Sequence, residues 1–186
     1  MQEVNLKILL LNYTANLCDK QFIFTLPKGK KIKVVFFRES LCHLMGLQYV
    51  YDRNSNFLGA KGYKKIEEES ITFASLKSHN KKQYGFIKER LRHFDKIIEV
   101  LRQGKIIRFD EKQVARGTYI VADFMIFNEK EDFILHLFLR KEQNTDIYAP
   151  VSFVVHSKND INAYKFLEGQ KVMNIVDRTE ISQLIE

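Results

Sequence analysis

The sequence predicts an α+β domain in which N-terminal helices and a small β-hairpin pack on a C-terminal antiparallel sheet of about four to five strands. Residues 81–103 carry an apolar stripe at helical spacing. From residue 105 onward, β-branched and aromatic runs follow one another without long helical crossovers, which is typical of an antiparallel meander. No linker interrupts the sequence, so we expect a single domain over residues 1–186, with a helical half at about 1–104 and a sheet half at about 105–186.

The N-terminal half begins with a predicted helix over residues 3–17. Its apolar stripe consists of Val4, Ile8, Leu11 and Ala15. Residues 20–37 follow as a predicted hairpin, because Pro27 and Gly29 separate two β-branched and aromatic runs.

Helices continue to residue 103. Residues 38–47 predict a short helix that ends at Gly46, since glycine most easily takes the left-handed closing conformation. Short helices and loops are expected over residues 48–80, with Thr72 as a cap. Residues 81–103 predict one helix. Its basic residues Arg92 and Lys96 either belong to a solvated face or form a ridge that follows phosphates.

The second half consists of predicted strands at 105–110, 118–127, 133–141, 147–156 and 171–177. Alternation in the hairpin of residues 133–156 favours a register in which Arg140 lies opposite Tyr148, and His136 opposite Ser152. In this register His136, Arg140, Tyr148 and Ser152 share one polar face. That face is either an ordinary solvated sheet surface or a surface for catalysis or nucleic-acid binding.

The charge composition indicates which class of partner to expect. The 30 Lys and Arg against 23 Asp and Glu give a formal charge of +7, which favours an anionic partner, nucleic acid first and a membrane surface second. The N-terminus resembles neither a signal peptide nor a membrane span, so we expect a cytoplasmic protein that does not insert into membranes. Cys18 and Cys42 are too few for a disulfide scaffold or a zinc site.

Motifs for cofactors and metals are also missing. The sequence contains no glycine-rich phosphate loop, no HExxH and no GxSxG, so we expect no cofactor and no metal. Histidine, arginine, tyrosine and serine suit RNA cleavage by internal transesterification, because the substrate supplies its own nucleophile, the 2′-hydroxyl. The protein then needs a base, an acid and cations for the phosphate.

Two segments, FFRESLCHLMGL at 36–47 and LFLRKEQNTDIYAPVSF at 137–153, with KIIRFD between them, carry a family resemblance. The chain resembles the phage-associated nuclease-like family, fourth subgroup, of the barnase–EndoU–colicin–RelE superfamily. A His-Leu-x-Gly-Leu motif corresponds to residues 43–47, and a Tyr-x-Pro-x-Ser-Phe motif corresponds to residues 148–153. Leu41 and Cys42 depart from the aromatic residues expected before the histidine.

The resemblance implies helices packed on an antiparallel sheet, metal-independent endoribonuclease activity and a toxin or phage-effector role, with an antitoxin or immunity protein as a further partner. From the chemistry, we expect His43 to act as base or acid, Arg140 to bind phosphoryl oxygens and Ser152 to donate a hydrogen bond. His136 is the reserve histidine, and His43 alternatively serves as a hydrogen-bonded core residue.

Lys105 and Arg108 are either phosphate contacts or solvated strand residues. The leading hypothesis is therefore a metal-independent endoribonuclease acting on RNA. The alternatives are a non-catalytic module of the same fold that binds nucleic acid or protein, and a purely structural interaction module.

Overall fold

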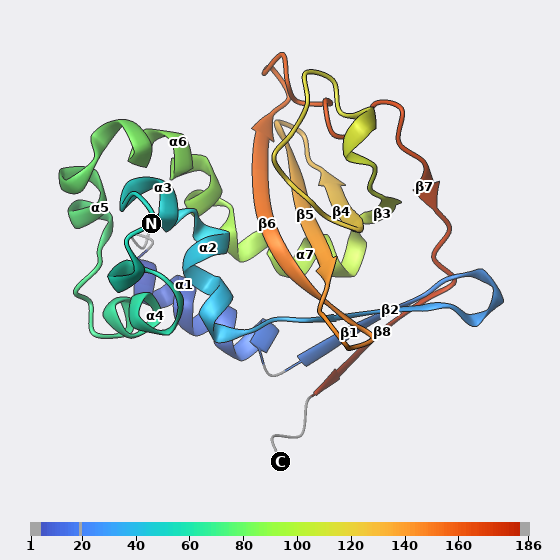
Figure 1. Cartoon of the computed structure of the whole chain (residues 1–186), viewed down its shortest axis with the longest axis horizontal. Coiled ribbons are helices and arrows are strands. Elements are labelled where there is room, and N and C mark those ends of the chain that lie inside the picture. Colours follow the sequence, from blue (N-terminus) through green and yellow to red (C-terminus); the bar gives the residue numbers. More distant parts are fainter. Residues whose placement is uncertain (1–4, 19, 183–186) are drawn as a thin grey trace.

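The computed structural model describes residues 5–18 and 20–182 and has an α+β fold, as predicted. Helices α1 to α6 gather beside the sheet, and α7 crosses one of its faces (Figure 1). The helices are α1 Leu6–Tyr13, α2 Leu41–Met45, α3 Leu47–Val50, α4 Gly59–Glu67, α5 Phe73–His79, α6 Lys81–Arg92 and α7 Ile97–Gln103. The strands are β1 Lys20–Thr25, β2 Lys31–Val35, β3 Lys105–Arg108, β4 Phe124–Glu129, β5 Phe133–Lys141, β6 Ile147–Ser157, β7 Val172–Met173 and β8 Asp177–Ser182.

The sheet is larger than predicted. In the described part of the chain it has eight strands, in the order β7-β3-β4-β5-β6-β2-β1-β8. The predicted size of four to five strands is wrong because the β1–β2 hairpin joins the sheet instead of packing on it. The join is a parallel pairing of β2 with β6, so the sheet is not purely antiparallel. Strand β8 adds an outer edge, and its mostly exposed residues show no apolar alternation that could have predicted it.

Several predictions for the helical half are confirmed. The hairpin turns at Pro27–Gly29, α2 ends at Gly46 with a φ of 87°, and Thr72 caps α5. The predicted inner face of the first helix is wrong. Ile8, Leu11 and Ala15 are exposed, and the buried residues are Leu6, Leu9, Leu10 and Tyr13. Val4 lies outside the described residues.

The single helix predicted over 81–103 is broken. α6 ends at Arg92 with His93 as its cap, and a short 3-10 turn at Phe94–Lys96 leads into α7. The Phe94 ring in this turn is buried, with its centroid 6.0 Å from that of Tyr13 and 6.1 Å from that of Phe153. The break lets α6 pack against α3 while α7 packs against β4 and β5.

The predicted register of the β5–β6 hairpin is also wrong. A β-bulge between Phe138 and Leu139 sets Phe138 opposite Ser152 but Leu139 opposite Pro150. As a result His136 pairs with Val154, and Arg140 pairs with Ala149. A bulge adds one residue to one strand, here Val151, and so reverses the alternation of faces beyond it.

Both faces of the sheet bury apolar side chains. The helices cover the face that carries Leu135, Leu137 and Phe153. The opposite face holds a second core with Ile134 and Phe138, which residues 158–170, here called the cover segment, close through Ala163 and Phe166. This explains why β5 reads as an almost continuous apolar run.

Strand β8 is fixed to two elements. Glu180 accepts hydrogen bonds from Lys20 of β1 at 2.5 Å and from Arg102 of α7 at 3.0 and 3.1 Å. Arg178 donates to the carbonyl of Leu101 at 2.8 Å and to that of Gly104. Among the described residues, no helix is long and apolar enough to cross a membrane.

Candidate functional site

Helices α2 and α3 lie on the side of the sheet next to β6 (Figure 1). Residues of these helices and of the bulged part of β6 line a cleft of about 720 Å³. Three residues predicted as catalytic from separate segments line it together: His43, Arg140 and Ser152. The structure therefore brings His43 together with side chains that lie 97 and 109 positions further along the sequence.

Gly46 sets the position of His43 on the helical side of this cleft. The backbone of Gly46 lies in the left-handed region, and a Cβ added to Gly46 would come within 2.9 Å of both Arg90 Nη1 and Ile87 Cγ2. Only glycine fits both the conformation and the close approach of α6. The chain therefore turns sharply between α2 and α3, so that His43 from one helix and Tyr49 from the other both line the cleft.

On the sheet side of the cleft, the β-bulge determines which side chains of β5 and β6 share a face. Because paired residues point to the same face, Ser152 shares the face of Phe138, and Arg140, two positions further along β5, also points that way. Tyr148 pairs with Lys141 and points to the opposite face, where its ring centroid lies 5.1 Å from that of Phe124. Tyr148 is thus separated from the cleft that it was predicted to share.

His136 does not reach the cleft either. It shares the face of Ser152, but it lies at the end of that face which the cover segment closes, and its side chain is 0% exposed. Phe166 of the cover segment packs against it with ring centroids 5.4 Å apart. The polar face predicted from alternation is therefore half core and half open cleft.

The basic residues predicted as phosphate contacts lie elsewhere. Lys105 and Arg108 stand at the two ends of β3, where the pairing partners Phe127 and Phe124 place them on opposite faces of the sheet. Arg92 pairs with Glu89 at 2.6 Å and Lys96 with Glu99 at 2.9 Å. None of these four residues lines the cleft with His43.

The cleft contains functional groups that the sequence did not indicate. Arg53 lines it from the turn after α3, and its backbone is left-handed, with a φ of 60°. The polar composition of residues 52–56 suggests a loop, but no pattern shows that this loop returns to His43. Other polar lining residues are Glu39, Gln48, Tyr49, Tyr119 and Glu142.

Arg90 adds a buried positive charge behind the cleft. Its side chain is 8% exposed, and its guanidinium lies 5.7 Å from the centre of the Tyr49 ring. No carboxylate of the described residues pairs with it. Desolvation lowers the pKa of Arg90, while Tyr49 acts in the opposite direction. The buried Oε1 of Gln48 also lacks a hydrogen-bond partner in this part of the chain.

His43 itself is exposed, and its environment favours the neutral ring. Desolvation by the surrounding protein lowers the pKa of His43 below its ordinary 6.5, with an opposing contribution from the Val151 backbone. The nearby charges of Arg90, Arg140 and Arg53 lower this pKa further. A neutral imidazole beside several guanidinium groups can accept a proton next to a bound anion.

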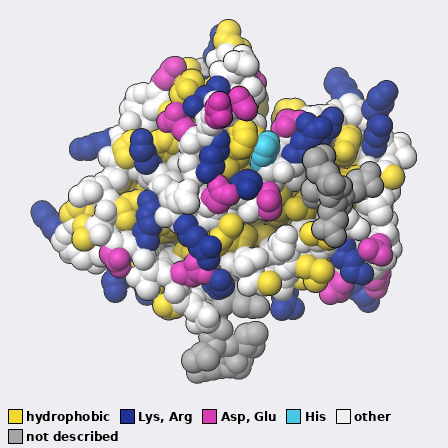
Figure 2. All heavy atoms as spheres, turned by 180° about the vertical axis from the view of Figure 1, so that it is seen from behind, with side chains coloured by type: hydrophobic (Ala, Val, Ile, Leu, Met, Phe, Trp, Pro, Cys, Tyr) yellow, Lys and Arg dark blue, Asp and Glu magenta, His cyan; other side chains and the backbone are white. Residues whose placement is uncertain are grey.

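The face seen in Figure 2 shows no further basic site of this kind. On the face seen in Figure 2, Lys and Arg side chains are interspersed with Asp and Glu and form no continuous basic patch. The overall charge of +7 thus locates no binding surface by itself. The arginines around His43, and not the overall charge, therefore mark the candidate site.

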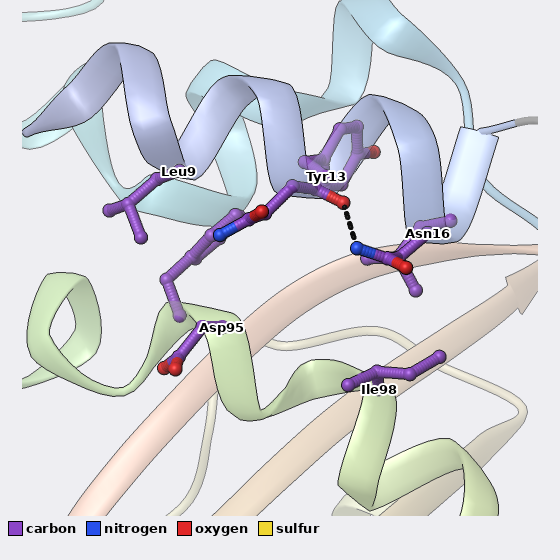
Figure 3. Close-up of a pocket in the computed structure, with 8 residues that line it drawn as sticks. Leu9, Tyr13, Asn16, Asp95 and Ile98 are labelled. Carbon is purple, nitrogen blue, oxygen red and sulfur yellow. Dashed lines mark hydrogen bonds between the residues drawn. The ribbon is translucent and has the colours of Figure 1, made fainter.

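A second hollow, of about 170 Å³, lies between α1 and the turn before α7. Figure 3 shows Leu9, Tyr13 and Asn16 on one side and Asp95 and Ile98 on the other. Asn16 is already engaged through a hydrogen bond from Nδ2 to the Asn12 carbonyl at 3.0 Å. With one carboxylate and no basic side chain in its lining, this hollow does not suit a phosphate.

Metal ligands do not cluster in the described residues: no group of three or more His, Cys, Asp or Glu side chains is arranged to hold a metal ion. The polar groups at the cleft are instead those of acid–base and phosphate-binding chemistry, namely imidazole, guanidinium, hydroxyl and carboxylate.

An α+β fold with a histidine and arginines around one cleft is an arrangement suited to a nuclease. Comparison with known families agrees, because the model of the family described as phage-Barnase-EndoU-ColicinE5/D-RelE like nuclease4 matches residues 8–185. The chain belongs to this family of nucleases. No curated protein and no solved structure matches it.

Proposed function

We propose that this protein is an endoribonuclease that cleaves RNA without a metal at the cleft of His43, Arg140 and Ser152. The observation that carries the proposal is the convergence of these three side chains on one cleft in a chain of a nuclease family. In the proposed reaction His43 accepts the proton of the 2′-hydroxyl, whose oxygen then bonds to phosphorus as the bond to the 5′-oxygen breaks.

The remaining groups would stabilise and complete this step. Arg140 and Arg53 would bind the phosphoryl oxygens, and Ser152 would donate a hydrogen bond to one of them. The departing 5′-oxygen takes up a proton, for which Glu39, Tyr49 and Glu142 are the candidate donors in the cleft. The products are a 2′,3′-cyclic phosphate and a 5′-hydroxyl.

Incubation of the purified protein with RNA and excess chelator tests the proposal. We expect cleavage with cyclic phosphate ends, and no cleavage of the same RNA carrying 2′-O-methyl groups, which lack the nucleophile. His43→Ala should lower the rate by about 10²–10⁴-fold, as expected for loss of a general base. The matched control is His79→Ala, which removes another exposed histidine that does not line the cleft. Equal losses in the two variants, or cleavage that requires a metal, would overturn the proposed mechanism.

Salt dependence tests the proposed phosphate contacts. If Arg53 and Arg140 each neutralise one phosphate, Arg53→Gln and Arg140→Gln should each flatten the slope of log affinity against log salt by roughly one unit. Lys105→Ala and Arg108→Ala serve as the comparison, because these residues lie on β3 away from the cleft. Affinity without any salt dependence in the wild-type protein would remove nucleic acid as the ligand.

A further inference from the structure

Two aromatic side chains stand exposed at the helical side of the cleft. Tyr49 of α3 lines the cleft and is 41% exposed, and Phe86 of α6 is 68% exposed. Their ring centroids lie 5.5 Å apart with planes inclined at 75°, and we call them the aromatic pair. Single exposed apolar side chains are common on protein surfaces, but these two rings contact each other and one of them lines the cleft.

Positive charges lie on either side of the aromatic pair. Lys82 and Arg90 are four positions before and after Phe86 on α6, and residues at this spacing share one face of a helix. Arg90 also contacts the other ring, at 5.7 Å from the centre of Tyr49. The exposed Lys82 and the aromatic pair therefore lie on the helical side of the cleft of His43, and the buried Arg90 packs against the Tyr49 ring.

This combination fits an unpaired nucleotide. Proteins that bind single-stranded nucleic acid use a basic groove for the backbone and exposed aromatic rings on which bases stack. Bases inside a duplex are stacked on one another and cannot reach such rings. A protein partner is the weaker explanation, since Tyr49 of the aromatic pair lines the same cleft as Arg53 and Arg140 and contacts the guanidinium group of Arg90.

We propose that the aromatic pair is a stacking platform for an unpaired base next to the bond that is cut, so that the substrate is a single strand or loop and not a duplex. This inference rests on the proposed function, because it places the platform beside the reacting phosphate. It assigns Phe86, which lies outside the cleft itself, a role in substrate selection.

Binding of a non-cleavable RNA provides the test. The probe is a fluorescent 2′-O-methyl oligoribonucleotide of mixed sequence, presented to the full chain either alone or annealed to its complement. We expect tighter binding of the single strand, and a loss of about ten-fold in that affinity for Phe86→Ala, the size typical of one base–aromatic stack. Phe86→Leu should lose nearly as much, since it keeps an apolar side chain but removes the ring.

The matched control is Tyr164→Ala in the cover segment, which removes an aromatic residue as exposed as Tyr49, at 41%. Equal effects of Phe86→Ala and Tyr164→Ala, equal affinity for single strand and duplex, or no binding of either probe would overturn the inference. Cleavage of unmodified RNA separates the two proposals. If binding depends on Phe86 but RNA is not cleaved, the stacking platform is supported and the nuclease mechanism is rejected. If RNA is cleaved but binding does not depend on Phe86, the nuclease mechanism is supported and the stacking platform is rejected.

Discussion

His43 carries the acid–base step of the proposed reaction, and its surroundings determine the pH at which it works. Desolvation lowers its pKa, and Arg90, Arg140 and Arg53 act in the same direction. A base must be unprotonated, so activity falls when acid protonates the ring. With the pKa below the ordinary value of 6.5, this fall comes at a lower pH than for a free histidine.

The pH profile of kcat/KM should therefore show an acid limb with its midpoint below pH 6.5. Arg140→Gln removes one of the neighbouring charges, and we expect the midpoint to rise toward 6.5 at the same time as the rate drops. Profiles of the wild-type protein and the variant on one short RNA measure both effects. A wild-type midpoint above 6.5, or one that Arg140→Gln leaves in place, would contradict the assignment of His43 as base.

Arg53 lies in a turn with a strained backbone next to the cleft. Asp52 and Arg53 both have left-handed backbones, with φ values of 47° and 60°, although neither is glycine. Each such residue costs about 1–2 kcal/mol relative to a right-handed one. Strain of this kind is often retained at functional sites.

The substitution Arg53→Gly should relax this backbone strain and also removes the positive charge of the side chain. We expect an unfolding free energy that is unchanged or higher by up to about 1 kcal/mol, because glycine also loses more entropy on folding. We expect RNA cleavage to decrease in the same variant. Thermal unfolding and initial rates measure the two effects, and a variant that is as active as the wild-type protein would show that Arg53 has no part in the site.

At the scale of elements, the junction of α2 and α3 is the most constrained point of the site. Gly46→Ala would place a methyl group 2.9 Å from Arg90 Nη1 and Ile87 Cγ2, in a left-handed conformation. We expect a loss of about 1–3 kcal/mol in unfolding free energy and a lower cleavage rate, because the joint orients His43.

Gly85→Ala is the matched control. Its added methyl group would meet nothing within 4 Å on α6, so we expect a gain of about 0.5–1 kcal/mol from helix propensity. Urea unfolding of both variants checks this. A Gly46→Ala variant that unfolds like Gly85→Ala would mean that α6 moves easily away from the joint.

The sequence predicted those elements whose signals are local. The Pro27–Gly29 turn and the glycine that ends α2 depend on backbone preferences of single residues, and both are confirmed. The break at His93 was missed because it follows from the packing of Phe94 between Tyr13 and Phe153, which no local pattern shows. The bulge at Val151 adjoins Pro150, and a proline inside a strand is typical of a bulge, so this local signal was present in the sequence and was overlooked.

The candidate site could be predicted only in part, because local motifs are visible in the sequence and tertiary contacts are not. His43, Arg140 and Ser152 stand in motifs that the sequence displays, whereas Arg53 and Arg90 reach the cleft region only through the folding of other elements. Tyr148 was misplaced by the assumption that alternation continues unbroken along β6, which the bulge contradicts. His136 was misplaced by the assumption that the polar face is open along its whole length, whereas the cover segment closes one end of it.

At the scale of the whole molecule, the second core makes stability depend on pH. Complete burial lowers the pKa of His136 to about 3, with a further contribution from His156 on β6. The pKa of His156 is also lowered, by desolvation and by Lys165, while Asp160 opposes this. In the native protein His136 is therefore neutral where the unfolded chain, with a pKa near 6.5, already binds a proton.

Stability contributed by a neutral buried histidine is complete above pH 6.5 and is lost as the pH falls from there toward 3. At pH 5 we expect the unfolding free energy to be lower than at pH 7.5 by about 2 kcal/mol from His136 alone. His136→Leu removes the titrating group and should flatten this dependence. Urea unfolding at the two pH values measures it, and an equally steep loss in the variant would assign the effect to other groups.

Strand β8 pairs with β1, which is the first strand of the same sheet in the chain, and covers its edge. A ribosome that adds about 5–20 residues per second needs on the order of ten seconds to make the roughly 150 residues between them. Throughout this interval β1 presents an unpaired edge, and such an edge is a template for pairing with other chains. The cleft residues from His43 to Ser152 all emerge before β8 does. A ribosome that stalls after Ser152 and before β8 would therefore leave a chain that has the proposed cleft residues but tends to aggregate.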